Sequence, residues 1–279
     1  MFRKRNIDDA AGLMTRFGLV LTFLFLLLPV LLSVTMAFDS RTYLGRFPPP
    51  GFSLQWLRSF LSSAYLLIGL QNSLIVAATA SLVSITLGAL AAVALQRASF
   101  PGRDLVMAIF LAPLIVPGVI LGFGLLLMFS ITGLLDGLPR IIAGHVLITF
   151  PFCLRATLAS LTGIRRSLTE AAMSLGANER QAFWEITLPL ARTGLLTGGV
   201  FAFAVSMDDV AVALFLADPQ TYTLPVALVS LMRANFDLTI AAASLVLLAV
   251  SALSTWLLAQ FVGLGAVLGQ GIYRQNAQE

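Results

Sequence analysis

The chain has 279 residues, of which 58% are hydrophobic and only 11% are charged, and its mean hydropathy is +0.94. This number of polar side chains is too small to cover the surface of a water-soluble globule of this size. The composition therefore excludes a soluble globular protein and predicts an integral membrane protein. The net charge of +4 is small. The single cysteine, Cys153, lies in an apolar run, which excludes an intrachain disulfide and a cysteine-based metal site.

An apolar first span follows a basic N-terminus that contains Arg3, Lys4 and Arg5. The uncharged run over residues 17–38 would extend about 33 Å as a helix, which is enough to cross the hydrocarbon core of a bilayer. Its apolar core is long for a cleaved signal peptide, and the small-residue cleavage pattern after it is poor. We therefore predict an uncleaved first transmembrane helix, preceded by a cytoplasmic segment over residues 1–16.

Five further apolar runs cover residues 73–95, 105–131, 141–164, 188–217 and 238–263. In lipid the backbone must satisfy its own hydrogen bonds, so runs of this length predict helices. The predicted fold class is therefore an all-α integral membrane protein with six transmembrane helices over residues 17–264 and a tail over residues 265–279.

Prolines mark two irregular places in this pattern. Residues 39–71 contain a triplet of prolines and predict an extended loop followed by a surface helix. Pro113 and Pro117 remove backbone donors within the third span and predict a kink, which is either static or part of a conformational change.

Basic residues indicate the orientation of the chain. Six spans place both termini, and the polar segment between the fourth and fifth spans, on one side of the membrane. That side carries 11 of the 17 Lys and Arg residues and the other side carries 5, while Arg155 lies inside the fourth span. By the positive-inside rule, the richer side is predicted to be cytoplasmic.

The polar segment between the fourth and fifth spans has helix start and stop signals of its own. Ser167 and Glu170 match a capping box that would begin one helix, and Gly176 is suited to end it. Asn178 can cap a second helix, and Pro189 would limit it. These signals predict two short helices with a bend between them, which form either a surface for another protein or a solvated loop.

The same segment resembles a known family signature. Glu170-Ala-Ala-Met-Ser-Leu-Gly176, followed by Ile186-Thr-Leu-Pro189, is similar to the EAA signature of the membrane subunits of ABC importers, with every fixed position present. Further stretches resemble the spermidine/putrescine (PotC-like) permease subfamily. They cover residues 72–78, 100–103, 112–118 and 201–210, and the likeness extends over approximately residues 15–265.

This resemblance implies a type I ABC importer permease fold in which residues 167–189 form a cytoplasmic coupling segment. The residues implied to contact a separate ATPase are Glu170, Ala171, Ala172, Gly176, Ala177, Arg180 and Pro189. The chain has no phosphate-binding GxxxxGK[ST] pattern, so it is expected to be non-catalytic and to hold no cofactor. ATP and magnesium would be bound by the partner ATPase.

The resemblance also implies the partners and the location. We expect a pair of ATPase subunits, a second and non-identical permease subunit, a periplasmic or lipid-anchored solute-binding protein, surrounding membrane lipid and no nucleic acid. The chain would lie in the bacterial inner membrane with both termini in the cytoplasm. Two alternatives from other classes are an ion-coupled secondary carrier and a membrane-embedded enzyme or assembly factor.

Charged residues inside the spans are the candidates for the solute pathway. Asp208 and Asp209 lie in the predicted fifth span, where a carboxylate is costly unless it faces water or a partner. They would attract a cationic solute such as a polyamine, or one of them would pair with Arg155. Because Arg155 could instead face the pathway or extend towards the lipid headgroups, an anionic or zwitterionic solute stays open.

The remaining polar and small residues have mainly structural interpretations. His145 lies alone in the fourth span without ligand-type neighbours, which favours a packing or interfacial role and no metal site. Three GxxxG pairs would permit close helix contacts. They are Gly118/Gly122, Gly194/Gly198 and Gly265/Gly269.

Overall fold

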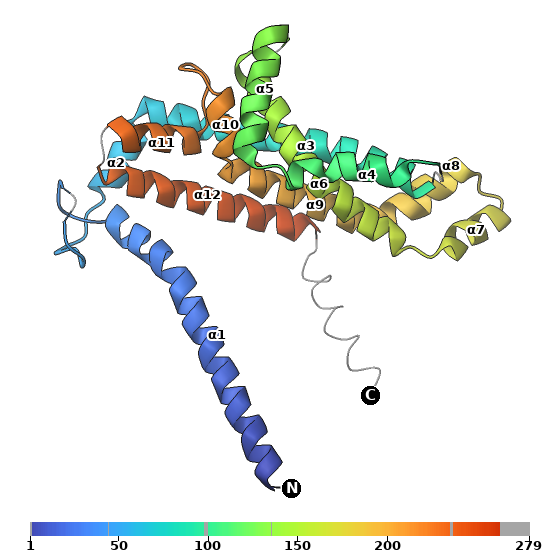
Figure 1. Ribbon diagram of the computed structural model, residues 1–279, viewed down its shortest axis with the longest axis horizontal. Helices are drawn as coiled ribbons and strands as arrows, with labels where there is room; N and C mark the ends of the chain where they lie inside the picture. The colour runs from blue at the N-terminus through green and yellow to red at the C-terminus, as the bar shows by residue number, and fades with distance from the viewer. Residues whose placement is uncertain (1, 44, 98–99, 135, 235–236, 263–279) are drawn as a thin grey trace. The chain divides into compact units, whose positions relative to one another are not determined.

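The computed structural model describes the backbone of residues 2–43, 45–97, 100–134, 136–234 and 237–262 (Figure 1). Within these ranges the regular structure is helical apart from one isolated bridge between Asp39 and Phe52. The pair Gly265/Gly269 and the predicted tail lie outside the described residues.

In the described ranges, five helices are long and apolar enough to cross a membrane, and a bent pair brings the number to six if it counts as one span. The long helices are α1 (Phe2–Ala37), α3 (Ala64–Arg97), α6 (Gly137–Thr162), α9 (Leu188–Asp208) and α12 (Thr239–Val262). The bent pair joins α4 (Arg103–Leu111) and the short 3₁₀ turn η1 (Ala112–Leu114) to α5 (Gly118–Thr132). The predicted all-α fold is confirmed, although α1 and α3 begin earlier than their apolar runs.

The first compact unit comprises the chain up to Ala64 together with residues 230–248. Its loop after α1 is held by Asp39, whose carboxylate accepts a hydrogen bond of 3.0 Å from Arg41 Nε. This bond and the nearby guanidinium charge hold the pKa of Asp39 below its usual value despite burial. The short helix α2 (Gln55–Ser62) follows, which confirms that a helix comes after the loop, although the apolar continuation of the predicted segment belongs to α3.

The second unit, residues 65–229 and 249 onward, is built around α6, which contacts α3 and α9 through small residues. A methyl group added to Gly88 of α3 would lie 2.8 Å from Cys153 Cβ, and one added to Gly198 of α9 would lie 2.9 Å from Cys153 Cα. Because side chains would separate these backbones, the glycines set the distance between the three helices. The close contact predicted for Gly194/Gly198 is confirmed.

The third predicted span is bent by 101° between its two halves, so it is a pair of helices and not one kinked helix. Pro113 lies in η1, and Pro117 precedes α5 with an extended backbone (ψ 134°). The Pro117 carbonyl accepts bonds from Ile120 N (2.9 Å) and Leu121 N (3.2 Å), which begins the new helix. The predicted interruption by the two prolines is confirmed, but it is a sharp bend between two helices, with Pro113 inside the turn and Pro117 directly before α5.

Two short helices follow α9. The helix α10 (Ala211–Leu216) packs on α5, where Gly118 and Gly122 admit Ala211 and Val212. After a loop comes α11 (Leu224–Ala234), which the sequence analysis did not anticipate. Its first turn is fixed to α3, because the Leu224 amide donates to Ser73 Oγ at 2.9 Å.

The loop between α10 and α11 is anchored by Asp218 and Arg140. Arg140 Nε donates to the Leu216 carbonyl at 3.0 Å, and Arg140 Nη2 lies 3.4 Å from Asp218 Oδ2. Burial raises the pKa of Asp218, but hydrogen bonds from Thr221 and Gln220 and the charge of Arg140 together outweigh it and lower this pKa. The loop therefore carries an ionised carboxylate at neutral pH.

Substituting Gly194 by alanine is expected to destabilise the packing of α9 on α6. The added methyl group would lie 2.3 Å from Ser160 Cβ and 2.6 Å from the Ala156 carbonyl oxygen, so backbone must shift. We expect a loss of about 1–3 kcal/mol, the usual cost of overpacking. Thermal unfolding in detergent measures it. Gly124→Ala is the matched control, since nothing lies within 4 Å of that position, and an equal effect of the two substitutions would contradict the packing argument.

Candidate functional site

The polar segment folds into two short helices, α7 (Arg166–Ser174) and α8 (Glu179–Ala182). Gly176 lies between them with φ +99°, a conformation that favours glycine. Its amide donates to the Met173 carbonyl at 3.0 Å, and the Ala177 amide donates to the Ala172 carbonyl at 3.1 Å. This is the Schellman pattern, so the predicted helix end at Gly176 is confirmed.

The two predicted helix starts have different outcomes. The capping box of Ser167 and Glu170 is wrong, because α7 begins at Arg166 after an extended Arg165, and Ser167 already lies inside the first turn. Asn178 does cap α8. Its Oδ1 accepts from Gln181 N and its own amide donates to Gln181 Oε1, both at 2.9 Å, which forms a capping box.

Pro189 does not end the second helix, contrary to the sequence prediction. The chain passes from α8 through the π-helical turn η2 (Phe183–Thr187) directly into α9, so residues 179–208 form one helical span. Pro189 lies in the first turn of α9. Proline is tolerated there because the ring lies immediately after the wider π turn, where regular i to i−4 bonding is only beginning.

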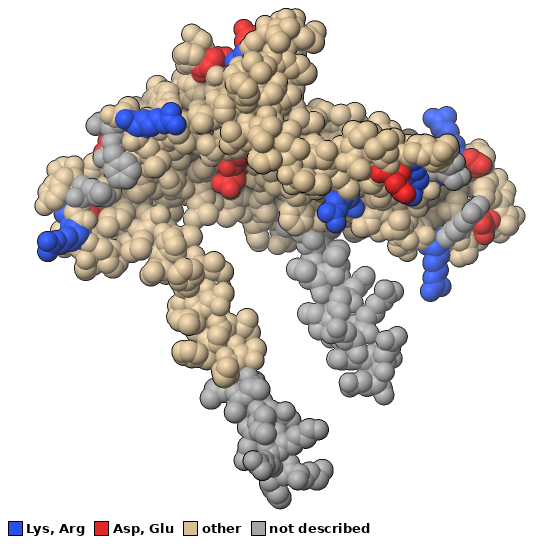
Figure 2. Space-filling view, viewed as in Figure 1, with Lys and Arg blue, Asp and Glu red and all other residues tan. Residues whose placement is uncertain are grey.

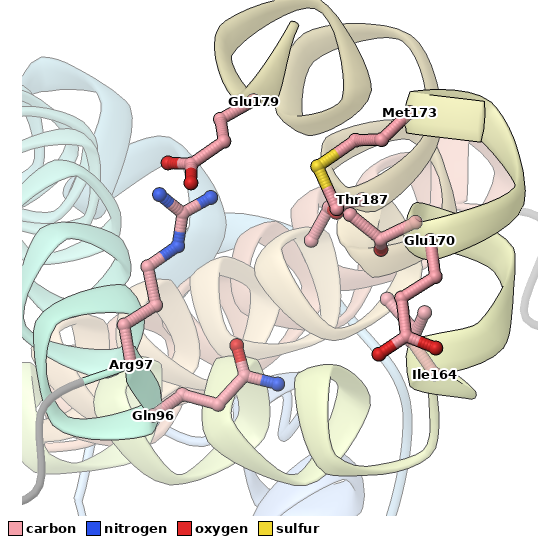
Figure 3. Close-up of a pocket in the computed structure, with 8 residues that line it drawn as sticks. Gln96, Arg97, Ile164, Glu170, Met173, Glu179 and Thr187 are labelled. Carbon is pink, nitrogen blue, oxygen red and sulfur yellow. The ribbon is translucent and has the colours of Figure 1, made fainter. Parts of the chain in front are cut away.

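A cavity of about 470 Å³ separates the coupling segment from the end of α3 (Figure 3). Glu170 and Met173 of α7 and Glu179 of α8 line it, opposite Gln96 and Arg97 of α3. In Figure 3 the carboxylate of Glu179 and the guanidinium of Arg97 point toward one another. The segment therefore presents charged groups towards α3.

The predicted coupling residues form a set with mixed exposure. Glu170 lines the cavity, Ala172 and Ala177 are half-buried, and the others are exposed, namely Ala171, Gly176, Arg180 and Pro189. Leu175, at the bend, is 90% exposed, which is unusual for a leucine beside a polar loop. Small and apolar side chains are thus displayed at the tip of the segment, where they are available to another protein.

A second candidate site lies where α9 ends and α10 begins. Asp208 closes α9, and Asp209 has an extended backbone. The Asp209 carboxylate accepts bonds from Val212 N (3.1 Å) and Ala213 N (2.9 Å). These bonds replace the helical partners that the break removes, so Asp209 acts as the cap of α10. The predicted fifth span is therefore interrupted at its two acidic residues.

His145 of α6 contacts this break from the side. Its side chain is fully buried, with Nδ1 2.6 Å from Ser206 Oγ and Nε2 3.7 Å from Asp209 Oδ2. A chain of bonds continues away from the break, since Thr149 Oγ1 donates to the His145 carbonyl at 2.7 Å and lies 2.8 Å from Ser84 Oγ. The cluster links α3, α6 and α9 inside the apolar core. A packing role for His145 was predicted, but its acidic and hydroxyl partners were not.

Asp208 and Arg155 are both exposed and are not brought together. Arg155 lies ten residues beyond His145 on α6, which is about 15 Å along the helix. The ion pair considered for Arg155 is absent among the described residues, and Asp209 faces His145 in its place. No sequence signal identifies this partner, because 64 residues separate the two and their contact depends on how α9 packs on α6.

Most of the face drawn in Figure 2 is uncharged. Within the described residues there is no group of three or more His, Cys, Asp or Glu side chains that could hold a metal ion. Two polar features bring together residues singled out by the sequence, namely the coupling segment and the break at Asp208 and Asp209.

Comparison with known proteins gives the following similarities. Residues 84–271 match the family described as "Binding-protein-dependent transport system inner membrane component". The chain is 28% identical over 229 residues to the spermidine/putrescine transport system permease protein PotC of Escherichia coli K12, covering 82% of this chain and 86% of that protein. It is 33% identical over 222 residues to the putrescine transport system permease protein PotI of the same strain, covering 77% and 78%.

Among solved structures, a chain of a bacterial ABC transporter involved in the import of the acidic polysaccharide alginate aligns with a TM-score of 0.72 at 19% identity. The alignment covers 94% of this chain and 98% of that one. The predicted permease family and type I fold are confirmed by these comparisons.

Removing the Asp209 carboxylate is expected to loosen α10. Asp209→Ala deletes the acceptor for the Val212 and Ala213 amides, and loss of a cap costs about 1–2 kcal/mol. Hydrogen exchange at residues 211–216 should accelerate by roughly tenfold. Asp209→Asn keeps an acceptor oxygen and should change exchange little. The exposed Asp208→Ala is the control, and equal acceleration in both alanine variants would contradict the capping role.

Proposed function

The chain belongs to the family of inner membrane components of binding-protein-dependent transport systems, and from this premise we propose that it forms half of the translocation pathway of an importer for polyamines. As a member of this family it is a multi-pass, non-catalytic permease subunit of an ABC importer. An ion-coupled carrier and a membrane enzyme, the two alternatives from other classes, do not fit that membership.

The observation that carries the choice of solute is the exposed carboxylate of Asp208 at the interrupted helix. The break lies beside His145, which is eight residues, or about 12 Å, along α6 from its first residue, Gly137. A helix that is broken this far from the end of a transmembrane span is tolerated where it is buried in protein or lines a cavity. A carboxylate there favours a cation, and both polyamine permeases similar to this chain are named for cationic solutes.

We assign the two acidic residues different tasks. Asp209 is occupied with the α10 amides and faces His145, so it positions the break. Asp208 has no such backbone bonds and is exposed, so it is the group that would meet an ammonium of the solute. A charge-assisted hydrogen bond of this kind contributes about 1.5–3 kcal/mol.

We propose that α7 and α8 seat in an ATP-hydrolysing partner. The exposed tip at Leu175 and Gly176 supports this, because it gives a small projection with an apolar side chain at its end. ATP and magnesium would be held by that partner, which we expect to be a pair of identical subunits. A second, non-identical permease would complete the pathway, and a periplasmic or lipid-anchored binding protein would deliver the solute.

The location follows the same family. We propose that the chain lies in the bacterial inner membrane with both termini and the coupling segment in the cytoplasm. The excess of basic residues on the side of residues 167–189 supports this orientation.

A second candidate solute class is anionic, and the exposed Arg155 favours it. A guanidinium on α6 could bind a carboxylate or phosphate in two-point geometry. The measurement that separates the two classes is uptake by Asp208 and Arg155 variants.

Neutralising Asp208 is expected to weaken cation uptake. With the full transporter and its binding protein in proteoliposomes, Asp208→Asn should raise KM for putrescine by about tenfold, corresponding to one lost charge-assisted bond. Asp208→Glu keeps the charge and should recover most of the affinity, and Arg155→Gln should leave putrescine uptake unchanged. Normal KM in Asp208→Asn, together with impaired uptake in Arg155→Gln, would instead indicate an anionic solute.

Strain at Gly176 is expected to uncouple the importer. Gly176→Val puts a branched side chain at φ +99°, which costs about 1–2 kcal/mol and favours a different exit from α7. Substrate-stimulated ATPase activity and co-purification of the ATPase should fall several-fold. Gly176→Asn is the matched control, because asparagine tolerates this conformation. Nothing in this chain lies within 4 Å of the added Cβ, so crowding by the described residues is not the cause of the expected loss. Full coupling in the valine variant would refute the role of this bend.

A further inference from the structure

An apolar groove lies beside the coupling segment, on the surface formed by α3, α6, η2 and the start of α9. Its volume is about 420 Å³. Leu90 and Val93 line one wall, Leu161 and Leu195 contribute from α6 and α9, and Trp184 lies at the rim with 57% of its surface exposed. Of the two threonines in the lining, Thr86 is bonded to its own helix, while the buried Thr157 hydroxyl has no hydrogen-bond partner among the described residues. Thr86 Oγ1 donates to the Leu82 carbonyl at 2.9 Å, and Thr157 is only 1% exposed.

The dimensions of the groove fit a single extended hydrocarbon chain. On α3 it runs from Ile85 to Ala94, and Arg97 lies one turn further on the same face. From Ile85 to Arg97 is about 18 Å, close to the roughly 15 Å thickness of one hydrocarbon leaflet.

One end of the groove is positively charged. The Arg97 guanidinium lies 4.9 Å from the ring centroid of Phe183, and that ring lines the groove. Arg97 is exposed, and its side chain also lines the polar cavity beside the coupling segment, so the guanidinium lies between that cavity and the groove. Glu179 points toward the same guanidinium from the cavity beside the coupling segment (Figure 3).

We propose that this groove binds one acyl chain of an anionic phospholipid, whose phosphate pairs with Arg97. The apolar lining, the length of one leaflet and the cation at its end together define the occupant. Arginine binds phosphate oxygens in two-point geometry, and each basic residue near an anionic membrane surface contributes about 1 kcal/mol. The proposal does not depend on which solute the importer carries.

Photocrosslinking in the assembled transporter tests the occupant. A benzophenone amino acid replaces Leu90, which lines the groove and is 64% exposed, and the complex is irradiated in its native membrane. Mass spectrometry then identifies the adducts. We expect phospholipid adducts in which anionic headgroups are enriched about fivefold over their share in the membrane, the factor that one Arg supplies. The same probe at Leu87, exposed on α3 outside the groove lining, should report the bulk composition.

The charge is tested by Arg97→Gln in the Leu90 probe background. It should return the adducts to the bulk composition, while Arg192→Gln, an exposed arginine on α9 outside the groove lining, should leave the enrichment intact. An adduct with another subunit would show that protein fills the groove. If the adducts at Leu90 have the bulk lipid composition, or if their enrichment survives Arg97→Gln, the groove makes only ordinary contact with membrane lipid. Each of these outcomes overturns the proposal.

Discussion

A peptide group in the hydrocarbon core has no water to bond, so every interruption of a transmembrane helix needs a replacement partner from within the protein. In the described residues, the break at Asp209 receives its replacement from a side chain, because that carboxylate accepts from Val212 and Ala213. The break at 112–117 uses backbone carbonyls, with Ala112 and Pro117 accepting from the residues that follow them. The break at Asp209 therefore depends on a charged side chain. Because the Asp209 carboxylate is hydrogen-bonded to backbone amides, it is less available to bind a solute. For this reason we assign different roles to the neighbouring residues Asp208 and Asp209.

The same constraint explains the close packing around α6. Helices in lipid gain little from burying apolar area, so close contact depends on small residues and on polar bonds between helices. Gly88, Gly194 and Gly198 bring α3 and α9 against α6. His145 and Ser206 then add a buried bond of 2.6 Å across the α6–α9 contact. The break in the fifth span thus lies beside this buried bond, at the end of α9 where Asp208 is exposed.

Much of the fold could be predicted from the sequence because hydrophobic runs and helix caps are local signals. The six apolar segments, the helix end at Gly176 and the cap at Asn178 all depend on residues a few positions apart. The errors are also informative. Pro189 predicts a helix end, but a π turn precedes it and the helix continues. Ser167 matches a capping pattern, but it lies inside the first turn of α7. The partner of Asp209 could not be predicted from the sequence. Its pairing with His145 depends on how α9 is rotated about its axis relative to α6, and the composition contains no information on that rotation.

The continuity of the span over residues 179–208 has a mechanical consequence. Thirty residues of helix form a rod of about 45 Å, which begins at α8 beside the cavity and ends at Asp208. If α8 moves with an ATPase, as proposed, the glycine contacts with α6 allow sliding or rotation with few side chains to displace, as in shear motions between packed helices. Ser206 lies in the last turn of this rod and bonds His145, which α6 holds in place. Movement of the rod must therefore strain or exchange that bond, and the orientation of Asp208 changes with it.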